Sequence, residues 1–204
     1  MGPLLPAKPS STDSAVNPAS LHPSKQPFVF LTHFKAVSAT NSMGPVEINR
    51  ANGDEDRADG ARITLDSKQY DRGLGVSGNS EVVYKLNGKY ARFFSDIGLD
   101  DSRGTGGSVD FQVWADGKKI YDSGVIAGND ATKGVSLMIR GVKQLKLVTT
   151  DAGDNADADM ADWANARLVP VIKKTVAPAP AVLMASARMI TKKPTDDVTT
   201  ADKA

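Results

Sequence analysis

Short stretches of alternating apolar and polar residues run through the middle of the chain. In one of them Val109, Phe111 and Val113 occupy one side of an extended backbone while polar residues occupy the other. The same period of two returns in residues 135–139 and 145–147. Because successive side chains of a β-strand point to opposite faces of the sheet, this pattern predicts strands that are buried on one face only.

Two dipeptides favour tight turns between such strands. Asn87–Gly88 and Asp116–Gly117 each stand between two alternating stretches, and both pairs tolerate the positive φ angles of a two-residue hairpin loop. We therefore expect each turn to join two strands that pair with one another. With several short strands and no long helical pattern, the chain is expected to be all-β, an antiparallel β-sandwich.

Proline and glycine divide the chain into three parts. Six of the 11 prolines lie in the first 27 residues and four lie at or after residue 170, whereas all 18 glycines but Gly2 lie in residues 44–153. Proline-rich segments that lack alternation are typical of disordered or extended arms. The expected organisation is an N-terminal arm over residues 1–27, a β-sandwich over residues 28–172 and a Pro/Ala/Lys tail over residues 173–204.

Composition and charge make several functions improbable. The chain has 25 basic and 24 acidic residues, a net charge of +1, and no basic cluster that could follow a phosphate backbone, so nucleic acid is not an expected partner. Cysteine is absent and the two histidines, His22 and His33, lie near the N-terminus, which argues against a zinc site or a Ser-His-Asp triad. No apolar run is long enough to span a bilayer, and no signal peptide is visible.

Five stretches of the chain form an ordered set of motifs: AVSATNSMGPVEINRANG, YDRGLGVSGNSEVVYKL, GLDDSRGTGGSVDFQVWADGKKIYDSGV, GVKQLKLVTTDAGD and ADWANARL. Together they resemble the NPCBM domain, the carbohydrate-binding module family 51 type. The resemblance covers about residues 30 to 170. It implies a galactose-binding-like jelly roll that is not an enzyme, binds galactose-containing glycans and holds a structural calcium ion. It also implies an extracellular or cell-surface location, because such domains accompany secreted bacterial glycoside hydrolases.

Three positions depart from the pattern of that family. Met43 stands where the family carries tryptophan, and Ser77 and Met160 stand where it carries histidines. An aromatic ring stacks on the C–H face of a sugar and imidazole hydrogen-bonds its hydroxyls, whereas a thioether fills apolar gaps and accepts hydrogen bonds only weakly. These departures weaken the expectation of sugar binding.

The candidate sugar-binding residues come from the motifs of the resemblance and from the acidic stretch that begins at residue 155. Carboxylates and amides would bind sugar hydroxyls, and the Trp163 ring would stack on the sugar. Asp157 belongs to the same acidic stretch. The alternative is that Trp163 anchors the core and the aspartates lie in a solvated loop. The candidates are Glu47, Ser77, Asn79, Asp159, Asp162 and Trp163.

Asp100 and Asp101 are the candidate calcium ligands. An EF-hand is excluded, because a loop that begins at Asp157 has Asp162, not glycine, at its sixth position. A site of another kind at Asp100 and Asp101, or in residues 54–56, stays open. The alternative is that these acidic residues bind their own turn backbone.

Two functions are therefore expected. The first is a non-catalytic module that binds a galactose-type glycan. The second is an assembly module that has lost the sugar site and binds protein partners through its surface and arms, including an apolar patch at residues 181–190 that is either a linker or a docking segment. The first predicts a shallow polar pocket beside Trp163; the second predicts that Met43 and Met160 are buried or lie in an exposed apolar patch. Catalysis by paired carboxylates is not favoured, because nothing in the sequence indicates a deep cleft.

Overall fold

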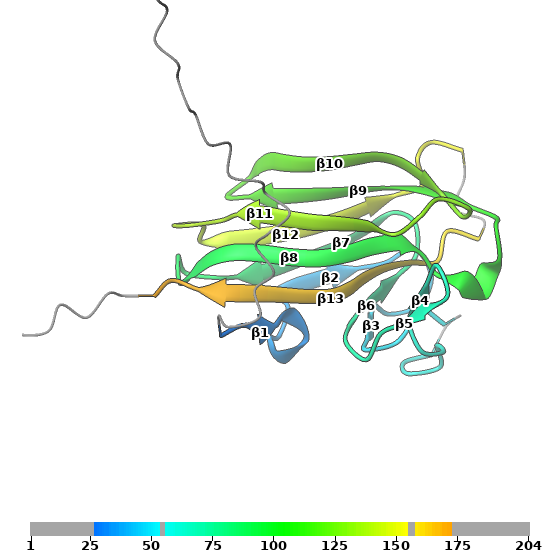
Figure 1. Ribbon diagram of the computed structural model, residues 1–204, viewed down its shortest axis with the longest axis horizontal. Coiled ribbons are helices and arrows are strands. Elements are labelled where there is room, and N and C mark those ends of the chain that lie inside the picture. The colour runs from blue at the N-terminus through cyan, green and yellow to red at the C-terminus, as the bar shows by residue number, and fades with distance from the viewer. Residues whose placement is uncertain (1–26, 54–55, 155–157, 173–204) are drawn as a thin grey trace, which may run out of the picture. The chain divides into compact units, whose positions relative to one another are not determined.

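Two antiparallel β-sheets pack face to face in a computed structural model of the protein (Figure 1). The structure describes residues 27–53, 56–154 and 158–172. The apolar residues of both sheets form one shared core, so the expected antiparallel β-sandwich is confirmed. No helix in the described part of the chain is long and apolar enough to cross a membrane.

The first sheet, sheet A, has six strands in the order β11-β8-β13-β6-β3, with β1 also paired to β13. Its central strand, β13, contains Asp162 and Trp163 and so places the end of the acidic stretch in the middle of the sheet. The strands are β1 (Val29–Phe30), β3 (Glu47–Ile48), β6 (Gly73–Val76), β8 (Tyr90–Leu99), β11 (Lys133–Met138) and β13 (Ala161–Pro170).

The second sheet, sheet B, has five strands in the order β10-β9-β12-β7-β2. The short strand β2 forms one edge of this sheet. The short strand β3 forms one edge of sheet A. The strands are β2 (Ser38–Thr40), β7 (Ser80–Lys85), β9 (Ser108–Ala115), β10 (Lys118–Ala127) and β12 (Gln144–Thr150).

One of the two predicted hairpins is correct and the other is wrong. Asp116–Gly117, with φ angles of 48° and 83°, joins the paired strands β9 and β10. Asn87–Gly88 also has the positive φ angles of such a turn, 54° and 69°, but it joins β7 of sheet B to β8 of sheet A. The backbone N–H of Asn87 donates to the carbonyl of Lys143 at 3.1 Å, and that of Gly88 donates to the carbonyl of Val142 at 2.8 Å, instead of to a partner strand. A turn motif specifies local backbone geometry, and packing then decides which sheet the chain enters.

The alternating residues face the core as expected. Val109, Phe111 and Val113 are fully buried, as is Trp163, whose ring meets that of Phe111 edge-on with centroids 5.0 Å apart. Leu137 is only half-buried, because β11 is an edge strand.

A small second layer covers the outer face of sheet A. The hairpin β4 (Thr64–Leu65) and β5 (Lys68–Gln69), together with the 3-10 helix η3 (Asp101–Arg103), lies near the start of β13, where Figure 1 also places β6 and β3. The other 3-10 helix is η2 (Leu31–His33), which follows β1. Ile63, Leu65 and Tyr70 pack against Ala164 of β13 in this layer. Polar side chains on the outer face of β13 are therefore buried under it.

Candidate functional site

The three positions that depart from the family pattern meet at one end of the sandwich. Nδ2 of Asn52 donates a hydrogen bond to the carbonyl oxygen of Met43 at 3.0 Å and lies 3.5 Å from Sδ of Met160. Oγ of Ser42 donates to Oγ of Ser77 at 3.0 Å. We call residues 41–43, 52, 77–79 and 159–160 the loop cluster.

Two asparagines that were not among the sequence candidates hold the loop cluster together. Nδ2 of Asn41 donates to Oδ1 of Asn52 at 2.9 Å, and Oδ1 of Asn41 accepts from the backbone N–H of Ser77 at 2.8 Å. Asn52 is 5% exposed. The Asn52–Gly53 pair marks a turn in the sequence, but nothing in that signal shows that the amide would bind a loop so distant in the chain.

Glu47, the first of the predicted sugar-binding residues, is buried. Its Oε1 accepts a hydrogen bond from the backbone N–H of Ala58 at 2.7 Å. Ala58 has a positive φ of 68°, so this carboxylate stabilises a loop of strained backbone geometry. The side chain shapes a loop and does not face solvent.

Ser77 and Asp159 are also buried, and both bind neighbouring loops. Ser77 accepts the hydrogen bond of Ser42, and Oδ1 of Asp159 accepts from the backbone N–H of Ser108 at 2.9 Å. A Cβ added at Gly78 would lie 2.8 Å from Oδ2 of Asp159, so the two loops are in close contact. The structure thus brings Ser77 and Asp159 together, inside the loop cluster.

Asn79 is the exposed residue among the six candidates. It has a positive φ of 62°, a conformation that asparagine tolerates better than most residues. Its Nδ2 donates to Oδ2 of Asp151 at 2.8 Å. This hydrogen bond, followed by one from the backbone of Gly153, lowers the pKa of Asp151. The pair forms an accessible amide and carboxylate at the rim of the loop cluster, and Asp151 was not predicted.

Trp163 does not present a stacking surface in this structure. Its side chain is fully buried between the sheets, and its Nε1 donates to Oγ1 of Thr149 at 3.2 Å. The alternative that Trp163 anchors the core describes its position correctly. The sequence does not distinguish the two roles, because an aromatic residue suits either.

Asp162 is fully buried on the outer face of sheet A, between Gly75 and Gly98 of the neighbouring strands. Neither carboxylate oxygen has a hydrogen-bond partner among the described residues. Burial raises the pKa of Asp162 well above its ordinary value, and the nearby carboxylates of Asp100 and Asp101 raise it further. A ligand in solvent cannot reach this carboxyl group.

Asp100 and Asp101 bind backbone N–H groups. The carboxylate of Asp100 accepts from Thr64 and Ser102, both at 2.9 Å, and that of Asp101 accepts from Asp66 at 3.0 Å and Ser67 at 2.8 Å. All four oxygens thus stabilise η3 and the turn between β4 and β5.

These two carboxylates do not fit a calcium site by themselves. Calcium takes six to eight oxygen ligands, about 2.3 to 2.6 Å away, and the described residues hold no group of three acidic, His or Cys side chains arranged for a metal. Calcium therefore stays a prediction without a matching site in this part of the chain. Residues 54–55 and Asp157 lie outside the described residues, as does the apolar patch at residues 181–190.

Comparison with known proteins identifies the family. The profile of the NPCBM/NEW2 domain matches residues 28–169. The chain belongs to this family of carbohydrate-binding module type, and its solved neighbours are domains of module family 51.

Three similar proteins illustrate the relationship. A Clostridium perfringens family 51 module from a GH95 protein, solved with methyl-galactose, is 32% identical with a TM-score of 0.64, and the match covers 70% of this chain and 100% of that one. A second C. perfringens module, from ZmpB and solved with GlcNAc, is 28% identical with a TM-score of 0.64 over 71% of this chain and 32% of that one. A Renibacterium salmoninarum protein provisionally named an endo-alpha-N-acetylgalactosaminidase is 32% identical over 142 residues, which are 68% of this chain but 9% of that protein.

Proposed function

We propose that this domain is a non-catalytic module that binds a galactose-type terminal sugar at the rim of the loop cluster. The observation that carries the proposal is the 32% identity, over the whole length of the neighbour, to a module solved with methyl-galactose. The three departing positions meet in one place in this chain, which supports the loop cluster as the corresponding surface.

The exposed groups of the loop cluster suit a small polar ligand held weakly. Asn79 and Asp151 offer an amide and a carboxylate for two sugar hydroxyls. Met43, 38% exposed, offers an apolar contact without the flat face of an aromatic ring. The buried candidates Glu47, Ser77, Asp159 and Asp162 hold the surface in shape, and Trp163 supports it from the core.

The role of the whole protein is part of this proposal. The chain spans 9% of the length of the R. salmoninarum relative, so we infer that it serves a larger secreted bacterial protein by holding it on a glycan outside the cell or at its surface. The assembly function is the alternative. Met160, 2% exposed, packs inside the loop cluster, and this burial is what the assembly function predicts, whereas Met43 is 38% exposed.

The test is a titration of the full chain, followed by ¹⁵N NMR, with methyl β-galactoside and with its C4 epimer methyl β-glucoside. We expect the galactoside to shift the resonances of Asn79, Asp151 and Met43 and the glucoside to have a weaker effect. Asn79→Ala should weaken galactoside binding by roughly fivefold, the effect of one lost polar contact, whereas Asn129→Ala, an exposed asparagine on another loop, should leave it unchanged. A folded chain that shows no response to galactosides or to an array of galactose-terminated glycans would favour the assembly function.

A further inference from the structure

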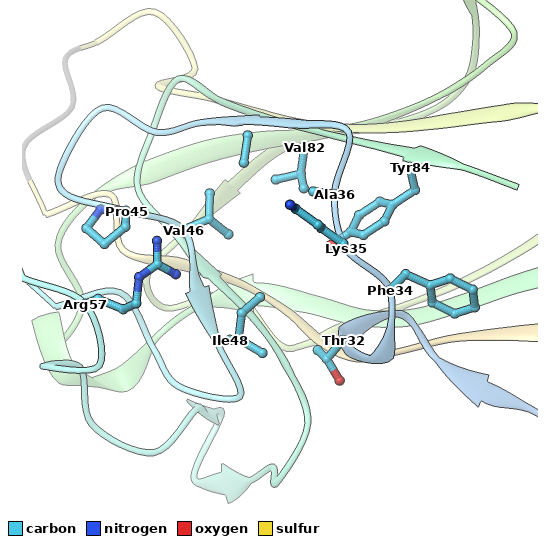
Figure 2. Close-up of a pocket in the computed structure, with 11 residues that line it drawn as sticks. Thr32, Phe34, Lys35, Ala36, Pro45, Val46, Ile48, Arg57, Val82 and Tyr84 are labelled. Carbon is cyan, nitrogen blue, oxygen red and sulfur yellow. The ribbon is translucent and has the colours of Figure 1, made fainter.

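A pocket of about 370 Å³ opens at the edge of the sandwich where the short strands β2 and β3 lie (Figure 2). No residue that lines it belongs to the loop cluster. Its volume lies in the range of small-molecule sites. The lining residues used in the argument below are Phe34, Lys35, Val46, Ile48, Arg57 and Tyr84.

The floor of the pocket is apolar. Val46 and Tyr84 are buried and belong to opposite sides of the sandwich edge, and Ile48 is 42% exposed beside them. Tyr84 is a core residue, and its burial raises the pKa of the phenol far above its ordinary value, so it stays neutral. A ligand in this pocket would therefore place an apolar face against aliphatic side chains.

Two cations stand at the mouth of the pocket. Figure 2 shows the side chains of Lys35 and Arg57 extending from different segments toward the space among Val46, Ile48 and Tyr84. Both residues are exposed, and neither has a hydrogen bond or ion pair to another residue in the described ranges. No acidic residue lines the pocket. Because these two side chains bring positive charge to a pocket that no acidic residue lines, the pocket complements an anion.

We infer that this pocket binds a sugar that carries a carboxylate, such as a hexuronic acid unit of a glycan. The C–H face of the sugar ring lies on Val46 and Ile48, and the carboxylate is placed between Lys35 and Arg57. A peptide strand fits less well, because the edge strands β2 and β3 have three and two residues and offer little backbone for strand addition. This site is separate from the proposed galactose site, and the chain would then bind neutral and acidic sugars on different surfaces.

The first test compares methyl β-glucuronide with methyl β-glucoside, which differ only in the carboxylate at C6. In ¹⁵N NMR titrations of the full chain we expect the glucuronide to shift the resonances of Lys35, Val46, Ile48 and Arg57, and the glucoside to leave them in place. The glucuronide effect should weaken at high salt, since both cations are exposed. Equal responses to the two sugars, no response to either, or shifts confined to other surfaces would overturn the inference.

The second test uses charge-removing variants. Lys35→Gln and Arg57→Gln should each weaken glucuronide binding by roughly fivefold, the upper range for one exposed ionic contact. Arg140→Gln removes an equally exposed charge outside the pocket and should have no effect. Ile48→Ser, at an exposed position, should also weaken binding if the apolar floor contributes. Retained binding in both charge variants would disprove the site, and so would preferential binding of a short acidic peptide there. We expect galactoside binding at Asn79 to be unaffected by either charge variant, because Lys35 and Arg57 lie outside the loop cluster, so the two proposals can fail independently.

Discussion

Nε1 of Trp163 donates a hydrogen bond to Oγ1 of Thr149 at 3.2 Å, and both residues are fully buried. Trp163 belongs to β13 of sheet A and Thr149 to β12 of sheet B, so this bond joins the two sheets inside the core. This bond gives the indole N–H of Trp163 an acceptor, so the largest side chain can lie in a core that is otherwise mainly apolar.

Thr149→Val should therefore destabilise the domain by about 1 to 2 kcal/mol, because it keeps the shape of the side chain but leaves the indole N–H buried without an acceptor. Urea unfolding followed by tryptophan fluorescence measures the change. Thr40→Val, on an exposed edge position, is the matched control and should stay within about 0.5 kcal/mol of the parent. Equal stability of the two variants would contradict the role assigned to the bond.

Gly75→Ala should be among the most damaging small substitutions in the domain. A Cβ at this position would lie 2.3 Å from the carbonyl oxygen of Arg50 and 2.4 Å from the backbone nitrogen of Asn52. The backbone on both sides must move, at a cost of about 3 kcal/mol or more. Gly134→Ala, where a Cβ would have open space, should be close to neutral. Comparing the melting temperatures of both variants with that of the parent tests this. A small decrease for Gly75→Ala would show that residues 50–52 can move at little cost in free energy.

Asp162→Asn should stabilise the domain at neutral pH. The pKa of Asp162 is raised in the folded state well above its ordinary value, chiefly by burial, so the folded chain binds this proton more tightly than the unfolded chain does. The stabilisation that depends on this proton is complete at pH values below the pKa of Asp162 in the unfolded chain. It is lost as the pH rises through the pKa of Asp162 in the folded chain. The neutral amide avoids that loss.

The measurement for Asp162 is the free energy of unfolding at several pH values between about 4 and 8. Relative to the parent, Asp162→Asn should gain stability as pH rises and exceed the parent at the upper end. Asp71→Asn, with a side chain that is 79% exposed, should retain the slope of the parent. A difference in stability between the parent and Asp162→Asn that does not change with pH would refute the assignment.

Met43→Trp should strengthen galactoside binding by about tenfold, because an aromatic ring offers the sugar a flat apolar face that a flexible thioether lacks, a difference of roughly 1 to 1.5 kcal/mol. The substitution restores the residue type, tryptophan, that the family resemblance implies at this position. Met138→Trp, at another exposed methionine on edge strand β11, is the control and should leave affinity unchanged. Isothermal titration with methyl β-galactoside distinguishes the two. A gain in both variants would indicate nonspecific stacking.

Removing calcium should leave the contribution of Asp100 and Asp101 to the melting temperature unchanged. The four carboxylate oxygens of Asp100 and Asp101 accept backbone hydrogen bonds, which need no metal. Asp101→Asn should lower the melting temperature by the same amount in EDTA and in calcium, because it weakens the turn at Asp66 and Ser67. A shift of several degrees on adding calcium would show that other residues complete a site.

Sequence periodicity specified the secondary structure well because it reports a local property. The alternation at Val109, Phe111 and Val113 predicted both a strand and its buried face, and Asp116–Gly117 predicted a hairpin that exists. Asn87–Gly88 has the predicted backbone conformation, yet its strands enter different sheets. The conformation of a turn depends on two residues, whereas strand pairing depends on distant ones.

The candidate site was predicted less well for the same reason. Glu47 and Asp159 are polar residues of predicted loops, and each accepts a backbone N–H group from another segment, 11 and 51 residues away in the chain. Asn41 and Asn52, which join the loops, carry no sequence signal that identifies a partner. The acidic stretch ends in a strand whose two faces are both covered, Trp163 by the opposite sheet and Asp162 by the outer layer.

The sequence by itself determined the class of the fold, the alternating strand faces and the family, because these follow from short-range patterns and ordered motifs. Only the tertiary structure decided which of the polar residues face solvent. It buried Asp162 and Glu47, left Asn79 beside Asp151, and placed Lys35 and Arg57 over one apolar pocket. Exposure is a property of packing between segments distant in sequence, and that packing is settled by the contacts of the whole domain.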